Sequence, residues 1–144
     1  MALSGSNSQH SINRKLVQYV AGQVVNFEVS LHHWTNYKVP IYGIDLEKER
    51  GIPADIRVFK NTIDPYEALM IAVNEHNLGI SSFFKNILDW TSRLDSQFLK
   101  GKKIMLMSTS ESEDGAHHAL EYMEKVVPLF GGEVVESFSL PSFS

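Results

Sequence analysis

The chain has 144 residues, of which 43% are hydrophobic and 21% charged, with a formal net charge of -4 at pH 7. This composition predicts one globular domain, and the modest acidic charge, spread along the chain, excludes a basic surface for nucleic acid. The absence of cysteine excludes a disulfide scaffold and thiol catalysis, and without a membrane-length apolar run or a signal peptide we expect a cytoplasmic protein with no membrane partner.

The first predicted element is a short apolar strand, residues 1–3, followed by a polar loop and a helix. Ile12, Leu16 and Val20 recur at helical spacing, and Ser11 can cap the helix. The loop lacks the glycines of a dinucleotide fingerprint and the Lys-Ser/Thr pair of a nucleoside-triphosphate loop. A helix N-terminus attracts anions, and the hydroxyls and amides of this loop could bond a monophosphate without a metal ion. The residues alone leave open an ordinary solvated loop.

Residues 27–31 alternate between apolar and polar side chains, which predicts a strand with one wetter side. His32 and His33 follow it. Neighbouring residues on a strand point to opposite faces, and no second ligand cluster lies close in the sequence. We therefore predict no metal site at this histidine pair.

Residues 34–51 are predicted to be mostly loop, because proline and glycine interrupt them. The charged run within them, residues 45–50, is typical of a solvated surface. Pro53 suits the first turn of a short helix, and Pro65 ends it. The apolar positions of this helix are Ile52, Ile56, Phe59 and Ile63.

The centre of the chain reads as strand, loop and helix in succession. Residues 68–73 are almost continuously apolar, which predicts a strand buried on both faces. Residues 74–79 contain two Asn and a Gly, so the strand ends there in a loop. Ser81 or Ser82 can cap the helix that follows. One stripe of this helix is apolar, namely Phe84, Ile87, Leu88 and Thr91, and another holds Lys85, Asp89 and Arg93 at the spacing of solvated ion pairs.

Residues 102–108 predict another buried strand, and residues 133–138 a fifth. An acidic, hydroxyl-rich loop, residues 108–115, lies between them and leads into an amphipathic helix. His117 and His118 fall in the first turn of that helix, where we predict them to be surface residues rather than metal ligands. The sequence predicts no metal site elsewhere.

Strands that alternate with helices imply parallel pairing through right-handed crossovers. Five such strands predict an α/β fold with a flavodoxin-like doubly wound five-stranded parallel sheet, order 2-1-3-4-5. Ligands bind at the switch point of such a sheet, between strands 1 and 3. This arrangement would bring together three loops, residues 4–13, 74–79 and 108–115. The first could hold a phosphate, while the other two flank a flat ring.

Three stretches resemble the motifs of one known family. Residues 5–13, Gly-Ser-Asn-Ser-Gln-His-Ser-Ile-Asn, are similar to a Gly-Ser-x-x-x-x-Ser-x-Asn phosphate loop. Residues 74–77, Asn-Glu-His-Asn, stand where that family has Pro-Glu-Tyr-Asn against a flavin. Residues 84–90, Phe-Lys-Asn-Ile-Leu-Asp-Trp, match its Leu-Lys-Asn-x-Leu-Asp-Trp helix. The sequence thus resembles the NADPH-dependent FMN reductase family, flavodoxin-like flavoproteins that include quinone, azo-dye and chromate reductases.

The resemblance implies a single FMN-binding domain over residues 1–144. This domain would use NADPH or NADH to reduce flavin, a quinone or a similar small-molecule electron acceptor by hydride transfer. The cofactor carries the chemistry, so no catalytic residue is required; Glu75 beside His76 could assist a proton transfer. The resemblance assigns cofactor-binding roles to Ser6, Ser11 and Asn13 at the phosphate and to Asn74, Glu75, His76, Asn77 and Ser110 around the isoalloxazine.

The chain departs from the family pattern in places. Acidic residues between 110 and 114 replace a glycine-rich loop and would repel the phosphates of a second nucleotide. A non-enzymatic flavodoxin-like electron carrier and a flavin-free interaction module are therefore the alternatives. The resemblance also implies a homodimer or homotetramer formed through the helix that begins at Ser82, on which we expect Trp90 to be exposed. The first strand is also short and no final helix follows: either this sequence is a shortened one or those elements are absent, and if they are absent we expect part of the sheet to be uncovered.

Overall fold

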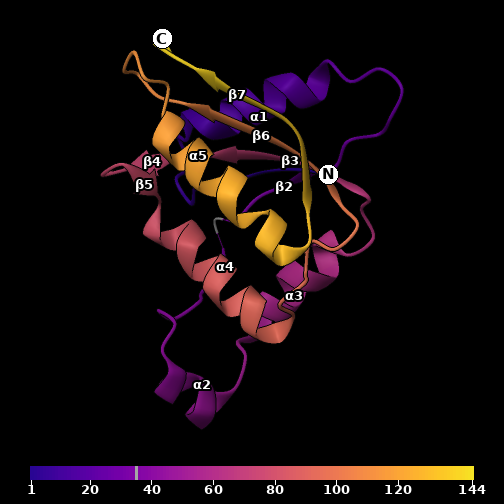
Figure 1. Cartoon of the computed structure of the whole chain (residues 1–144), viewed down its shortest axis with the longest axis vertical. Helices are drawn as coiled ribbons and strands as arrows, with labels where there is room; N and C mark the ends of the chain where they lie inside the picture. Colours follow the sequence, from indigo (N-terminus) through magenta and orange to yellow (C-terminus); the bar gives the residue numbers. More distant parts are fainter. Residues whose placement is uncertain (35) are drawn as a thin grey trace.

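The computed structural model describes residues 1–34 and 36–144, which form a parallel sheet with helices on both faces (Figure 1). The strand order is β2-β1-β3-β6-β7, and each neighbouring pair is parallel. Numbered within this sheet alone, the order is the predicted 2-1-3-4-5, so the flavodoxin-like fold class is confirmed. The strands are β1 (Ala2–Ser4), β2 (Leu31–His32), β3 (Ala68–Val73), β6 (Lys103–Thr109) and β7 (Glu133–Leu140).

The helices divide between the two faces of the sheet. One face packs against α1, and the other against α3, α4 and α5 (Figure 1). The helices are α1 (Ile12–Gly22), α2 (Ile44–Arg50), α3 (Ala54–Ile63), α4 (Ser82–Leu94) and α5 (His117–Val126), with a 3-10 turn η1 (Pro128–Phe130) after α5. Two apolar layers result. Ile56, Ile87 and Met123 are 0% exposed in the larger layer, while Leu16 and Val17 of α1 anchor the smaller one.

The predicted strand over residues 27–31 is confirmed only at its end, as β2. Only Leu31 and His32 pair with β1, and Phe27 is 79% exposed. The reason lies in the neighbouring strand. Because β1 has three residues, it offers few backbone groups with which β2 can pair. Residues 27–30 therefore alternate between apolar and polar side chains but do not extend the strand.

The charged run at residues 45–50 is helical, as part of α2, where the sequence predicted loop. The apolar periodicity that would have revealed a helix is absent, because α2 buries no residue. Its charges instead complement the helix dipole. Asp45 and Glu47 lie in the first turn, and Lys48 and Arg50 in the last. Residue 35, also in the predicted loop, lies outside the described residues.

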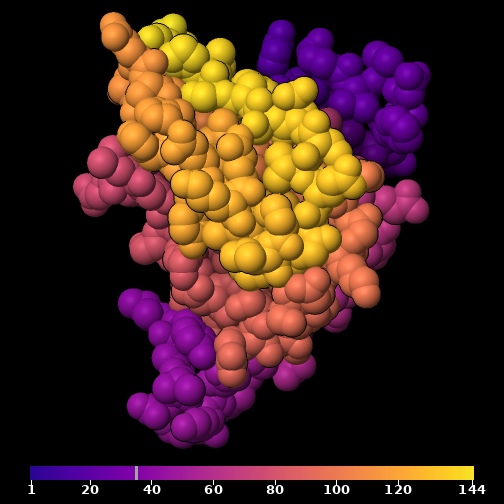
Figure 2. Space-filling view, in the orientation of Figure 1, coloured from indigo at the N-terminus to yellow at the C-terminus, as the bar shows by residue number. Residues whose placement is uncertain are grey.

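Trp90 was expected to be exposed and is fully buried, so this prediction is wrong. A segment near residue 40 crosses α4 and covers it. The Trp90 indole donates a hydrogen bond to the carbonyl of Pro40 at 2.8 Å, and its ring meets Tyr42 edge-on with centroids 5.0 Å apart. Asn86 of α4 fixes the same segment, donating to Pro40 O and accepting from Tyr42 N. In the space-filling view this segment and α2 form a lobe that projects from the body (Figure 2).

The predicted ion pairs on α4 are confirmed in part. Lys85 pairs with Asp89 one turn later, as the spacing suggested. Arg93 instead reaches Glu47 of α2 at 3.0 Å. The α2 lobe is thus tied to the end of α4 by an exposed ion pair.

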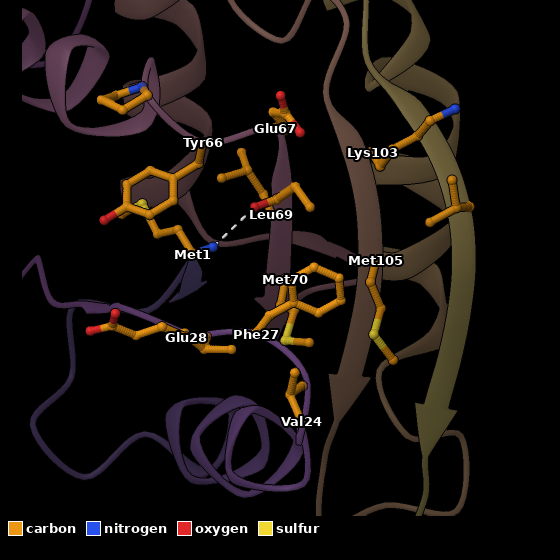
Figure 3. Close-up of a pocket in the computed structure, with 14 residues that line it drawn as sticks. Met1, Val24, Phe27, Glu28, Tyr66, Glu67, Leu69, Met70, Lys103 and Met105 are labelled. Atoms are coloured by element: carbon orange, nitrogen blue, oxygen red, sulfur yellow. Dashed lines mark hydrogen bonds between the residues drawn. The ribbon is translucent and has the colours of Figure 1, made fainter.

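Among the described residues, one part of the sheet borders an open hollow. Beside α1, the amino-terminal ends of the strands border a cavity of about 450 Å³ (Figure 3). Met70 and Met105 lie on its floor, and Phe27 reaches toward it from the loop after α1. Val135 of β7 is 52% exposed at its rim.

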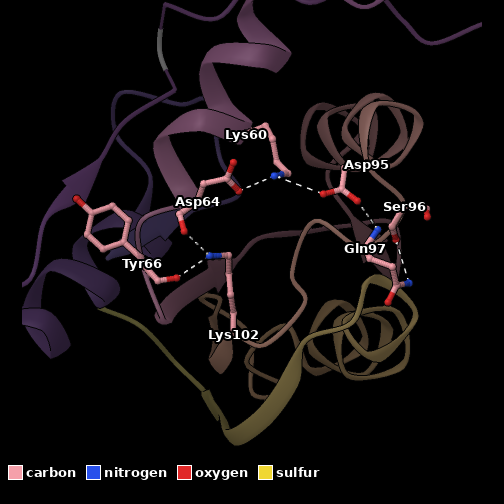
Figure 4. A network of polar contacts seen from close by, with 7 residues as sticks. All are labelled: Lys60, Asp64, Tyr66, Asp95, Ser96, Gln97 and Lys102. Atoms are coloured by element: carbon pink, nitrogen blue, oxygen red, sulfur yellow. Dashed lines mark hydrogen bonds and ion pairs between the residues drawn. The ribbon is translucent and has the colours of Figure 1, made fainter.

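A polar network closes the amino-terminal edge of the sheet on the opposite face (Figure 4). Lys102, only 7% exposed, donates to the carbonyls of Asp64 at 3.0 Å and Tyr66 at 2.6 Å. These carbonyls follow the C-terminus of α3, where a cation is favourable. Burial lowers the pKa of Lys102, and the neighbouring charge of Lys60 lowers it further.

We expect Lys102→Met to lower the free energy of unfolding by about 1–3 kcal/mol, because two carbonyls lose their donor. Lys103→Met is the matched control, since Lys103 makes a solvent-exposed pair with Glu133 that contributes at most about 1 kcal/mol. Urea denaturation of both variants measures the difference. Equal effects of the two substitutions would contradict this assignment.

Candidate functional site

A cavity of about 530 Å³ lies at the carboxyl ends of β1, β3 and β6, within the usual range for small-molecule sites. The three loops that the sequence analysis expected to converge do so here. Asn77 is not among the lining residues, because it lies in a turn that points away. The cavity is lined by Ser6, Ser8, Ser11, Ile12, Asn13, Asn74, Glu75, His76, Thr109, Ser110, Glu111 and Ser112.

The loop from β1 to α1 is held by serine side chains that accept hydrogen bonds from nearby amides. The Ser6 hydroxyl accepts from Ser8 N and the Ser8 hydroxyl from His10 N, each at 3.2 Å. Ser11 accepts from Arg14 N at 3.2 Å and is the predicted N-cap of α1. Because each oxygen acts here as an acceptor, each hydroxyl proton remains available to an anion.

The N-terminus of α1 adds backbone donors to this loop. Within residues 1–34 and 36–144, the amides of Ile12 and Asn13 find no acceptor. They are the first two amides of an 11-residue helix, where N–H groups and the helix dipole favour negative charge. Side-chain hydroxyls and free amides thus converge on one side of the cavity.

Gly5 and Ser81 fix the position of this loop against the core. A Cβ atom at Gly5 would lie 2.6 Å from Cδ1 of Phe84, so only glycine permits the close approach to α4. The Ser81 hydroxyl donates to Gly5 O at 3.1 Å and accepts from Phe84 N, which makes it the N-cap of α4. The backbone of Gly5 also bonds Ala72 of β3 at 2.8 Å. The loop is therefore part of the packed structure.

Asn13 joins the first loop to the end of β6. Its side-chain oxygen accepts from Thr109 N at 2.9 Å, and its side-chain nitrogen donates to Thr109 O at 3.0 Å. The residue is 3% exposed. Both ends of its amide group are therefore engaged with the backbone of Thr109, and Asn13 positions two walls of the cavity relative to each other.

Residues 74–79 form a small hairpin where the sequence predicted a loop. Strands β4 (Glu75–His76) and β5 (Gly79–Ile80) pair antiparallel. The two residues between them, Asn77 and Leu78, have φ values of 51° and 63°, the left-handed conformations of a tight hairpin turn. This turn directs Glu75 and His76 toward the cavity and leaves Leu78 68% exposed.

Asn74 holds an unsatisfied polar atom in the cavity wall. Its Nδ2 lies 3.2 Å from Nε2 of His76, while its buried Oδ1 has no partner among the described residues. Exchanging the two amide atoms would leave the nitrogen unpartnered instead, so one end of the amide is unsatisfied in either orientation. A buried unsatisfied group costs stability unless a ligand or water completes it.

Glu75 caps the N-terminus of α5. Ala116, the residue directly before α5, has a left-handed backbone and no side chain that could cap the helix. Oε2 of Glu75 instead accepts from Ala119 N at 3.0 Å. A carboxylate at a helix N-terminus also interacts favourably with the dipole. Glu75 thus connects the hairpin to the helix on the other side of the cavity.

The loop after β6 forms an acidic wall. Ser110 and Ser112 donate to Oδ1 of Asp114, which also accepts from Ala116 N. The hydrogen bond from Ser112, with that from Ala116, lowers the pKa of Asp114 below its usual value. Asp114 is therefore ionised at neutral pH, and Glu111 on the cavity rim adds further negative charge.

Seven of the eight cofactor-binding residues predicted from the sequence line the cavity, and several other lining residues were not predicted. Thr109 and Ser112 were within the predicted loop but carried no motif of their own. Ile12 had been assigned to the buried stripe of α1. The signal that could have found it is its place directly after the N-cap, where its amide is free.

This arrangement defines a flavodoxin-like α/β protein with a loop of free hydroxyls and amides at the switch point of its sheet. The model of the NADPH-dependent FMN reductase family matches residues 1–143, and the chain belongs to that family.

The chain is similar to several named oxidoreductases. It is 27% identical to a quinone reductase of Escherichia coli over 89 residues, 62% of this chain and 47% of the relative. It is 26% identical to an NAD(P)H-dependent FMN reductase of Pseudomonas aeruginosa over 127 residues, 88% of this chain and 68% of the relative. A solved NAD(P)H:acceptor oxidoreductase from Paracoccus denitrificans superposes with a TM-score of 0.73 at 25% identity, covering 94% of this chain and 72% of that one. The chain thus spans about half the length of the Escherichia coli relative.

Among the helices that the structure describes, none is long and apolar enough to cross a membrane.

We expect Glu75→Ala to lower the free energy of unfolding by about 1 kcal/mol, because α5 loses its cap. Glu75→Gln keeps an acceptor oxygen and should retain most of this stability. Urea denaturation of both variants tests the capping role. A Gln variant as unstable as the Ala variant would show that the carboxylate charge, rather than the hydrogen bond, is what matters.

Proposed function

We propose that the chain binds FMN and uses NADPH or NADH to reduce flavin, a quinone or a similar small-molecule acceptor. The observation that carries this proposal is the convergence of an anion-binding loop with two loops that enclose the space beside it. In this proposal the hydroxyls of Ser6 and Ser11 and the amides of Ile12 and Asn13 hold the phosphate. Their hydrogen bonds and the dipole of α1 would stabilise the negative charge of the phosphate without a metal ion.

The ring of the cofactor would lie between the hairpin and the loop after β6. The unsatisfied amide of Asn74 supports this assignment, because an isoalloxazine ring carries both an N–H donor and carbonyl acceptors. His76 and Ser110 would border the ring, as the resemblance implied. Asn77 would act through the hairpin turn, in which its left-handed backbone directs the preceding residues.

When bound, FMN supplies the acceptance and donation of a hydride, so the protein must position and shield it. Asn13 would act as a positioning residue, because its amide group is engaged by Thr109. A proton-transfer role for Glu75 would need a free carboxylate. Its bond to Ala119 favours a positioning role instead, through the N-terminus of α5. The single domain of residues 1–144 would thus contribute geometry and electrostatics rather than an acid–base pair.

The acidic loop supports one competing function, that of a flavodoxin-like electron carrier. Glu111 and the ionised Asp114 belong to the loop that replaces the glycine-rich loop of the family pattern, and their negative charges would weaken binding of the phosphates of a nicotinamide nucleotide. A carrier would accept electrons from a protein and would not need that nucleotide. The third alternative is a flavin-free interaction module, which the cofactor-binding experiment distinguishes from the other two.

We expect the purified chain to retain FMN through gel filtration and its absorbance bands to bleach within seconds under anaerobic NADPH or NADH. Bands that persist with both nucleotides would favour the carrier, and absence of bound flavin would overturn the flavoprotein proposal.

Ser6→Ala should weaken FMN binding by about 10-fold or more, because a hydrogen bond to a charged group is lost. Ser96→Ala, an exposed serine on another part of the surface, is the control.

A homodimer or homotetramer is also proposed, with the lobe of α2 at the interface. Ile41 is 86% exposed and Ile44 55% exposed, beside a hollow of about 360 Å³ between this segment and α4. Burial of exposed apolar side chains drives association. A cytoplasmic location stays a prediction from the sequence.

Gel filtration with light scattering should therefore give at least a dimer, which Ile41→Asp should convert to a monomer. Leu129→Asp changes an equally apolar exposed residue in η1 and should leave the assembly intact. A monomeric unmodified chain, or equal effects of both substitutions, would contradict the proposed interface.

A further inference from the structure

The turn between β6 and α5 brings together three side chains that can bind a metal ion. Asp114, His117 and His118 each offer one ligand atom, and these atoms all lie within 4.8 Å of one another. The two imidazole rings face each other with centroids 3.9 Å apart. Sequence spacing did not predict a ligand set here, because the two histidines alone were expected to be surface residues.

The backbone conformation explains why Asp114 joins the histidine pair. Gly115 and Ala116 have φ values of 60° and 64°, so the chain reverses sharply and His117 N bonds back to Asp114 O at 3.2 Å. A side chain at Gly115 would collide with Ser139. A left-handed alanine is unfavourable by about 1–2 kcal/mol. The tight turn is therefore held in place by its surroundings.

The carboxylate of Asp114 is ionised and fixed through one oxygen only. Ser110, Ser112 and the amide of Ala116 all use Oδ1. Among the described residues, Oδ2 and the ring nitrogens of both histidines have no hydrogen-bond partner. Three free ligand groups of the types that zinc prefers therefore share one partly exposed corner.

We propose that Asp114, His117 and His118 form a binding site for a divalent transition-metal ion of the zinc class. Ligand atoms around tetrahedral zinc lie about 3.4 Å apart, so small rotations of the exposed Asp114 and the half-buried His117 and His118 side chains would complete the site. Water would supply the fourth ligand. None of these three residues lines the cavity proposed to hold FMN. The two sites are linked, because Asp114 accepts a hydrogen bond from Ser110 in the wall of that cavity.

Local charge determines whether a cation can bind at this position. The N-terminus of α5 carries a positive partial charge, which opposes a metal ion. Asp114 offsets it directly, and Glu75 caps the same helix end with a second carboxylate. Glu111 and Glu113 in the same loop add two more acidic side chains. These carboxylates therefore favour a cation at this position.

The test is titration of the full, chelator-treated chain with Co²⁺, followed by visible absorbance, and with Zn²⁺ in competition. We expect one ion per chain and the absorption bands of a tetrahedral site with nitrogen ligands. The titration is read both without and with FMN. Its outcome on the flavin-free chain does not depend on the proposed function.

Single-residue variants assign the ligands. Asp114→Asn, His117→Gln and His118→Gln should each weaken the metal affinity at least about tenfold, since loss of even supporting groups costs that much. His33→Gln, an exposed histidine outside the cluster, is the matched control and should leave the affinity unchanged. Circular dichroism checks that Asp114→Asn, which keeps an acceptor oxygen, remains folded. Absence of stoichiometric binding, unchanged affinity in any ligand variant, or equal loss in His33→Gln would overturn the proposed site.

Discussion

The pair of hydrogen bonds between the Asn13 amide and the backbone of Thr109 is the interaction on which the site depends. A parallel sheet brings the carboxyl ends of its strands to one edge, but it does not by itself fix how the loops there are spaced. Asn13 does so at 2.9 and 3.0 Å, across 96 residues of sequence. The N-terminus of α1, which carries the free amides, is thereby held against the end of β6. Because the group is 3% exposed, water does not compete for these bonds.

A second constraint acts on the opposite wall of the cavity. Helix α5 begins after a left-handed alanine that cannot cap it, so its amides depend on carboxylates from elsewhere. Glu75 reaches it from the hairpin, and Asp114 reaches Ala116 from the preceding loop. One helix end therefore organises three segments at once. The same arrangement gathers negative charge, which bears on both nucleotide binding and the proposed metal site.

The far side of the molecule shows that a polar cluster at a sheet edge need not be functional. Lys102 satisfies the carbonyls after α3, and Lys60 pairs with Asp64 and Asp95 (Figure 4). These groups are mutually satisfied, whereas the cavity at the carboxyl edge keeps free donors and an unsatisfied amide. Unsatisfied groups distinguish a site prepared for a ligand from a network that stabilises the fold.

The sequence by itself determined the fold class, the strand order and the position of the cavity, because these follow from local patterns. Continuous apolar runs at β3 and β6 indicate buried parallel strands, and alternation with helices leaves few topologies. Tertiary structure alone decided the rest. The length of β2 depends on its three-residue partner, and Trp90 is buried by a segment 50 residues away. The partners of Asn13 and Glu75 lie 96 and 44 residues distant, and Asp114 joins the histidines only because a left-handed turn reverses the chain. Local periodicity carries no information on such contacts, since they depend on which surfaces meet once the chain has folded.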